Sequence, residues 1–98
     1  MIKSFRHKGL RQFFETGSVA GIQPHHAGKL QAQLTVLNIA VEPKDMSAPQ
    51  WRLHPLVGND PSGNSVQGHW AVNVNANWRL TFAFDAFDVV LVNYQDYH

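Results

Sequence analysis

The chain ends in a group of side chains that could transfer protons and bind an anion. Tyr94-Gln95-Asp96-Tyr97-His98 places a carboxylate, a phenol and an imidazole side by side, directly after an apolar segment typical of a β-strand. Chain ends are usually frayed and polar, so an end of this composition is either packed against the protein or used in its chemistry. Histidine changes its charge near neutral pH, which suits it to proton transfer. We therefore take Asp96, Tyr97 and His98 as candidate catalytic residues.

Two residues in the middle of the chain complete a set that could cleave RNA without a metal. Such a reaction needs a base for the ribose 2′-hydroxyl, a fixed cation for the phosphorane and an acid for the departing 5′ oxygen. His54 or His98 suits either proton transfer, and Arg79 suits phosphate because its planar guanidinium forms paired hydrogen bonds. Tyr97 suits base stacking or a hydrogen bond to phosphate. An alternative stays open, in which His54 is a partly buried sheet residue, Arg79 is solvated and the tail is packing.

The first half of the sequence predicts two helices. Residues 2–6 alternate loosely and predict a short strand, and apolar residues at helical spacing predict a helix over residues 8–16 that ends at Gly17. Pro24 suits the first position of a second helix, which must end before Pro43. The apolar stripe of this second helix recurs every three or four residues and consists of Ala27, Leu30, Leu34, Leu37 and Val41.

The second half of the sequence predicts a sheet. Residues 51–56 indicate a strand with Pro55 near its end or edge, and residues 57–68, which are rich in Gly, Asn, Ser and Pro with a single charge, indicate a mobile loop. Three further strands, separated by short turns, are predicted over residues 70–74, 78–84 and 87–92. The chain is therefore expected to form an α+β domain in which two N-terminal helices cover one face of an antiparallel sheet.

The two-residue period of a strand predicts which side chains share the open face of that sheet. The apolar residues of the 78–84 strand must face the helices, so Arg79 faces the other way. With Trp51 and Leu53 on the core side, Arg52 and His54 lie on the same open face as Arg79. We therefore expect His54, Arg79 and the tail residues to converge there.

Size, composition and charge set further bounds. At 98 residues the chain is expected to be one small domain, residues 1–98. It has no cysteine, its N-terminus lacks the apolar region of a signal peptide, and no stretch approaches the roughly 20 apolar residues of a membrane span, so we expect a cytoplasmic protein.

Residues 1–41 carry five basic residues against one acidic residue, whereas residues 42–98 carry three basic residues against six acidic residues. The basic N-terminal patch either orients the domain on a polyanion or is a solvated helix face.

The six histidines give little support to a metal site. His25 and His26 are adjacent and diverge on a helix, and the chain supplies no His-x3-His pair with a third ligand. We expect His25 and His26 to be exposed in the first turn of the second helix and His69 to lie at a strand edge. No cofactor is expected.

The order of several short motifs resembles that of the HigB (host inhibition of growth) toxins, within the RelE superfamily of bacterial toxin–antitoxin pairs. Two of these motifs, Trp-Arg-Leu-His-Pro-Leu and the terminal Asp-Tyr-His, are specific, and the set spans nearly the whole chain. The motifs are Ile2-Lys3-Ser4-Phe5, His7-Lys8-Gly9-Leu10, Phe14-Glu15-Thr16-Gly17, Trp51-Arg52-Leu53-His54-Pro55-Leu56, Asn77-Trp78-Arg79-Leu80-Thr81-Phe82 and Tyr94-Gln95-Asp96-Tyr97-His98.

This resemblance implies a compact RelE-like fold and a metal-independent endoribonuclease that enters the A site of the 70S ribosome and cuts mRNA during translation. It also implies a HigA-type helix-turn-helix antitoxin, with operator DNA contacted only through the toxin–antitoxin complex and no membrane partner. His54 carries over as a catalytic histidine and Arg79 as the phosphate-binding cation. Asp96, Tyr97 and His98 carry over as the terminal catalytic group.

The chain departs from the pattern of these toxins in one region. Members often have a lysine after His-Pro-Leu and then a short turn, whereas this chain has Val57 and a long neutral loop through Gly68. With that cation absent, either phosphate binding is weaker or Arg52 substitutes as a second phosphate-binding residue. Two rival functions follow from the same residues: a non-catalytic module that binds antitoxin or ribosome, and a nuclease that acts on free RNA.

Overall fold

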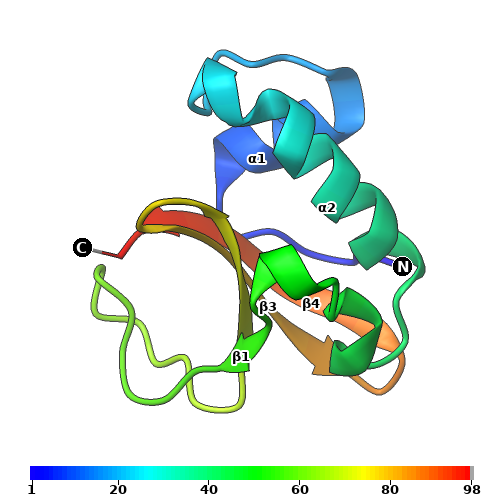
Figure 1. Cartoon of the computed structure of the whole chain (residues 1–98), viewed down its shortest axis with the longest axis vertical. Coiled ribbons are helices and arrows are strands. Elements are labelled where there is room, and N and C mark those ends of the chain that lie inside the picture. Colours follow the sequence, from blue (N-terminus) through cyan, green and yellow to red (C-terminus); the bar gives the residue numbers. More distant parts are fainter. Residues whose placement is uncertain (98) are drawn as a thin grey trace.

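The computed structural model describes residues 1–97, and both main helices lie on one side of the sheet (Figure 1). Helix α1 spans Lys8–Thr16, as predicted. His7 caps its first turn, since Nδ1 accepts a hydrogen bond from the Leu10 backbone N–H at 2.9 Å. Gly17 ends the helix in the left-handed conformation, with φ of 81°.

Helix α2 spans Ala27–Ile39 and is preceded by a short 3-10 helix, η1, at Pro24–His26. Together they confirm the predicted second helix, which ends at Ala40, before Pro43. Two further 3-10 helices follow, η2 at Pro43–Met46 and η3 at Pro49–Trp51. Proline begins each of these 3-10 helices because its fixed φ suits the first helical position.

Four antiparallel strands form the sheet in the order β1-β2-β3-β4. Their bounds are His54–Pro55 for β1, Trp70–Asn75 for β2, Trp78–Asp85 for β3 and Asp88–Asp96 for β4. The predicted strand at residues 2–6 consists of two isolated parallel bridges to β4, Ile2 with Val89 and Phe5 with Val92. Beyond Phe5 the N-terminal segment leaves β4, so the last residues of β4 form an edge of the sheet.

The core fills the space between the helices and one face of the sheet. Leu80 and Phe82 of β3 are fully buried there, as the two-residue period predicts. Helix α2 contributes Leu30, Leu34 and Leu37, none of them more than 1% exposed. These observations confirm an α+β fold with two helices packed on one face of an antiparallel sheet.

The predicted strand over residues 51–56 is wrong for most of its length. Trp51 ends η3, and Arg52 has a φ of 51°, in the left-handed region that side chains rarely adopt. Only His54 and Pro55 pair with β2. The alternation assumed from Trp51 onward therefore does not hold, and the side on which His54 lies follows from its pairing instead.

Residues 57–68 form a loop, as predicted, and the loop has a folded conformation of its own. Asp60 Oδ1 accepts hydrogen bonds at 2.9 Å from the backbone N–H groups of Ser62 and Asn64, which closes a tight turn. Val66, whose N–H donates to the Gly58 carbonyl at 2.9 Å, is only 2% exposed. The loop is thus hydrogen-bonded within itself and anchored by a buried apolar side chain.

Candidate active site

His54 and Arg79 lie on the same face of the sheet, opposite the helices. His54 pairs with Ala71, and that row continues across the sheet through Thr81. Arg79 is two residues before Thr81 on β3, so its side chain leaves the sheet on the same side. Two strand spacings and a two-residue rise put the Cα atoms of His54 and Arg79 roughly 12 Å apart. A dinucleotide can span that separation.

Tyr97 joins Arg79 at the end of β4. Gln95 pairs with Arg79 across the sheet, and Tyr97 follows two residues later, where its backbone N–H donates to the Asn77 carbonyl at 2.9 Å. Burial raises the pKa of the Tyr97 phenol and the charge of Asp60 adds to this, while the Arg79 guanidinium lowers the pKa by a smaller amount. Tyr97 therefore lies within electrostatic reach of both charged groups, and its hydroxyl is protonated at neutral pH.

The structure separates the tail residues that were expected to converge. Asp96 pairs with Trp78, whose ring packs on the helix side of the sheet, so the Asp96 side chain points away from the face of Arg79 and Tyr97. The expectation was wrong for Asp96 because β4 continues through Asp96, and strand alternation places neighbouring residues on opposite faces. His98 lies outside the described residues.

Two backbone carbonyls hold the Arg79 guanidinium. Nη1 donates to the Ala76 carbonyl at 2.9 Å and to the Trp78 carbonyl at 3.3 Å. Ala76 sits in the β2–β3 turn with a φ of 46°, so the turn orients these carbonyls toward the side chain. A guanidinium has five N–H donors in a planar fork, which leaves donors for an anion once its position has been set.

A hydrogen bond fixes the tautomer of neutral His54. Its Nδ1 lies 2.8 Å from the Arg52 carbonyl, which can only accept, so Nδ1 carries the proton. Nε2 is then unprotonated in the neutral ring and can take a proton from a substrate. The left-handed conformation of Arg52 is thus associated with the contact that orients His54. The Arg52 side chain is exposed, and its predicted role in binding phosphate stays a prediction.

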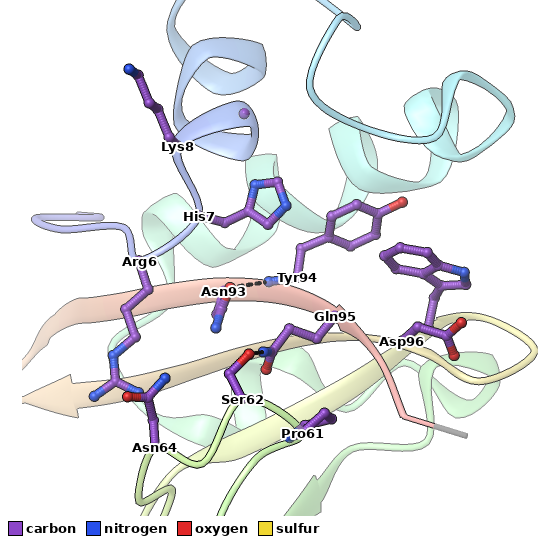
Figure 2. A pocket seen from close by; sticks show the side chains of 12 residues that line it. Arg6, His7, Lys8, Pro61, Ser62, Asn64, Asn93, Tyr94, Gln95 and Asp96 are labelled. Carbon is purple, nitrogen blue, oxygen red and sulfur yellow. Dashed lines mark hydrogen bonds between the residues drawn. The ribbon is translucent and has the colours of Figure 1, made fainter.

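A groove of about 850 Å³ runs along the free edge of β4 (Figure 2). One wall is the start of α1 with Arg6, His7 and Lys8, and the other is the loop at Ser62 and Asn64. In Figure 2 Arg6 extends toward Asn64, whereas Lys8 points away from the loop. Part of the basic N-terminal patch therefore borders the groove. Sequence reasoning noticed the charge of this patch but had no signal that it would meet the loop.

A second cluster lies on the helix side of β4. His26 Nδ1 is 2.5 Å from the Tyr94 hydroxyl, and His26 is 2% exposed, so the expectation of an exposed His26 was wrong. The 3-10 turn of η1 directs His26 inward while leaving His25 exposed. Burial, and secondarily the charge of His25, lowers the pKa of His26, and burial raises the pKa of Tyr94. This cluster explains why a tyrosine occupies position 94.

His69 is buried next to β2, and neither a metal site nor a membrane span is found among residues 1–97. His69 immediately precedes β2 but is 8% exposed, and burial lowers its pKa. Within residues 1–97 there is no group of three His, Asp or Glu side chains placed to hold a metal ion. No helix in that same part of the chain has the length and apolar character needed to cross a membrane.

Comparison with known proteins identifies the class to which this fold and this site belong. Residues 3–98 match the family model of the HigB-like toxins, described as RelE-like toxins of the type II toxin–antitoxin system HigB. The chain belongs to this family. It is also 38% identical over 98 residues to endoribonuclease HigB of Proteus vulgaris, and the similarity covers the full length of both chains.

Proposed function

We propose that this toxin is an endoribonuclease that cuts mRNA during translation. Membership of the HigB-like family and full-length similarity to a protein named as an endoribonuclease support that activity. The observation that carries the proposal is the shared face of the sheet, where Arg79 lies beside Tyr97 and His54 offers an unprotonated Nε2. These groups supply a cation, a hydrogen-bond donor and a proton acceptor.

The proposed chemistry uses side chains of the toxin and needs no metal ion. A histidine, either His54 or His98, removes the 2′-hydroxyl proton, and the ribose oxygen attacks the adjacent phosphorus. The bond from phosphorus to the 5′ oxygen then breaks as the other of these two histidines donates a proton to that oxygen, leaving a cyclic phosphate and a 5′-hydroxyl. Arg79 stabilises the charge that develops on the phosphorane. Tyr97, which is neutral at pH 7 as tyrosines ordinarily are, donates a hydrogen bond to a phosphate oxygen.

The remaining members of the predicted site take supporting roles in this proposal. Asp96 lies at the groove, where it can orient His98 or hold a ribose rather than touch the phosphate. Arg52 supplies an exposed cation next to His54. Arg6 extends along the groove and offers the RNA strand a second phosphate contact where the strand leaves the sheet.

We further propose the partners that this activity requires. The toxin enters the A site of the ribosome in the cytoplasm, and a HigA-type helix-turn-helix antitoxin neutralises it. The family supports an antitoxin partner in general terms, since its members are toxins of toxin–antitoxin systems. Operator DNA would be reached only through the toxin–antitoxin complex.

A cleavage assay with and without translating ribosomes tests this proposal. Cutting of mRNA only when ribosomes translate, unaffected by a chelator that leaves ribosomes intact, is the expected result. Equal cutting of free RNA would make the protein a ribosome-independent nuclease instead. Loss of cutting with the chelator would contradict the metal-independent mechanism.

One observation favours a second candidate, a binding module that no longer cuts RNA. The Tyr97 hydroxyl has almost no accessible surface, so RNA cannot reach it in the conformation described. This candidate predicts that Arg79→Ala and His98→Ala leave any growth inhibition unchanged. The endoribonuclease predicts that either substitution relieves it.

A further inference from the structure

The loop of residues 57–68 covers the end of the sheet where Arg79 and Tyr97 lie. Figure 1 shows it reaching from β1 toward the C-terminal end of β4. At that end the Gln95 amide Nε2 donates to Ser62 Oγ at 2.9 Å, the dashed contact between these two residues in Figure 2. Because Gln95 pairs with Arg79, this contact joins the loop to the strand position beside the proposed phosphate cation.

Asp60 brings a carboxylate to the same place. It is the single charged residue of the loop, it is only 6% exposed, and its charge acts on Tyr97 with the opposite sign to that of Arg79. Oδ1 closes the turn of the loop, but Oδ2 is buried and accepts no hydrogen bond from residues 1–97. A buried carboxylate oxygen without a donor costs free energy, on the order of 1–3 kcal/mol or more. The turn of the loop accounts for Oδ1 but not for the burial of Oδ2.

Polar side-chain atoms on the same face of the sheet as Arg79 share this condition. The Tyr97 hydroxyl, Gln95 Oε1 and Asn73 Oδ1 are buried and have no hydrogen-bond partner within the part of the chain that the structure describes. Asn73 and Gln95 flank Arg79 in one row across the sheet. Buried polar atoms without a hydrogen-bond partner are rare in proteins. Three of them on one face of the sheet indicate that this face binds a ligand when it is exposed.

The loop holds its shape through its own hydrogen bonds. Its internal hydrogen bonds include Asp60 N–H to the Asn64 carbonyl at 2.8 Å and Val66 N–H to the Gly58 carbonyl at 2.9 Å. Gly58 and Gly68, near its two ends, have φ of 74° and 82°, a region open to glycine at low cost. Val66 anchors the base of the loop, so the part that can rotate away from β4 is the turn at residues 60–64, which keeps its own hydrogen bonds.

We propose that loop 57–68 is an autoinhibitory cover, whose Asp60 carboxylate keeps the RNA phosphate away from Arg79 and Tyr97 until the loop swings off the sheet. This inference rests on the proposed endoribonuclease function. In the closed position the loop buries the Tyr97 hydroxyl, and a carboxylate repels the phosphate that Arg79 would bind. In the open position the Tyr97 hydroxyl reaches solvent beside the half-exposed Arg79, and RNA can occupy the place that the carboxylate has left.

Two substitutions loosen the cover without touching the proposed catalytic groups. Asp60→Asn removes the charge and keeps an oxygen that can close the turn, and Ser62→Ala removes the acceptor of the Gln95 hydrogen bond. Because the loop is closed over the sheet in the parent protein, each variant should cut mRNA on translating ribosomes roughly threefold to tenfold faster than the parent does. Asp85→Asn at the exposed β3–β4 turn and Ser65→Ala elsewhere in the same loop are the matched controls and should cut at the parent rate.

The pKa of Tyr97 gives a second readout that does not depend on cleavage. The chain has two tyrosines, so NMR of labelled tyrosine separates Tyr97 from Tyr94. Asp60→Asn should lower the Tyr97 pKa by removing the negative charge, and Ser62→Ala should lower it by exposing the hydroxyl. Parent-like or slower cutting by both variants overturns the cover. If no protein cuts RNA, the proposed function fails, and an unchanged Tyr97 pKa in both variants then overturns the cover separately.

Discussion

Tyr94 lies on β4 and Tyr97 directly follows that strand, three residues later, yet their hydroxyls lie in different surroundings. The Tyr94 hydroxyl is paired with His26 in the core, between the helices and the sheet. The Tyr97 hydroxyl is also buried, but no donor or acceptor among residues 1–97 pairs with it, and it lies near two charged groups. The Tyr94 hydroxyl thus stabilises the fold through a hydrogen bond, whereas the Tyr97 hydroxyl has no partner among residues 1–97 and is free to bind RNA once it is exposed.

Removing the cation on the Tyr97 side should have the largest effect. Arg79→Ala should reduce RNA cleavage about 10²-fold or more, because charge on the phosphorane loses its stabilising group. Arg79→Lys should restore part of the rate, since a lysine keeps the charge without the planar fork. The measurement is cleavage of mRNA on translating ribosomes. Arg11→Ala on the exposed face of α1 is the control, and equal rates for Arg79→Ala and Arg11→Ala would refute the proposed site.

Exchanging each tyrosine for phenylalanine tests the comparison directly. Tyr97→Phe should slow cleavage about tenfold with little change in the free energy of unfolding, because its hydroxyl has no partner in the free protein. Tyr94→Phe should cost about 1–2 kcal/mol of stability, because it leaves the buried His26 nitrogen unpaired. Cleavage assays and urea unfolding of both variants measure the two effects. Loss of stability in Tyr97→Phe together with slower cleavage in Tyr94→Phe would show that the roles of the two hydroxyls have been assigned wrongly.

The groove between the two regions should contribute a smaller share of RNA binding. Arg6→Ala should weaken RNA binding a fewfold and lower the slope of log affinity against log salt by about one, as expected for one lost phosphate contact. Lys8→Ala should change that slope less, because its side chain points away from the loop. Binding of a non-cleavable 2′-deoxy substrate across salt concentrations measures both. Equal slopes for the two variants would mean that the groove does not carry the strand.

The smallest effect should come from the histidines on the helix side of the sheet, which make the free energy of unfolding depend on pH. Burial lowers the pKa of His7 and of His26 below the ordinary 6.5, so the unfolded chain binds more protons than the folded one just below that pH. Stability is therefore complete above pH 6.5 and is lost as the pH falls from there through the lowered folded-state values.

His7→Ser isolates one part of this dependence. Serine can cap α1 without titrating, so the variant should lose stability less steeply in acid than the parent protein does. Urea unfolding above and below pH 6.5 measures the slope. An unchanged slope in the variant would assign the whole dependence to His26 and other groups.

Local patterns in the sequence determined most of the fold. The helical stripes, the end at Gly17 and the alternation of residues 78–84 each depend on neighbours within a few positions, and the structure confirms α1, α2 and the antiparallel hairpins. The separation of Asp96 from Tyr97 was also available from alternation. It was missed because the last strand was expected to end at residue 92 rather than at Asp96.

Only the tertiary structure decided how the candidate site is assembled. The left-handed Arg52, the inward turn of His26 and the meeting of Ser62 with Gln95, 33 residues away, depend on contacts between distant segments. Composition correctly marked residues 57–68 as a loop, but a loop rich in glycine and asparagine can extend into solvent or fold onto a sheet. The loop folds onto the sheet here because Val66 is buried and Ser62 contacts Gln95, and both contacts depend on surfaces outside the loop sequence.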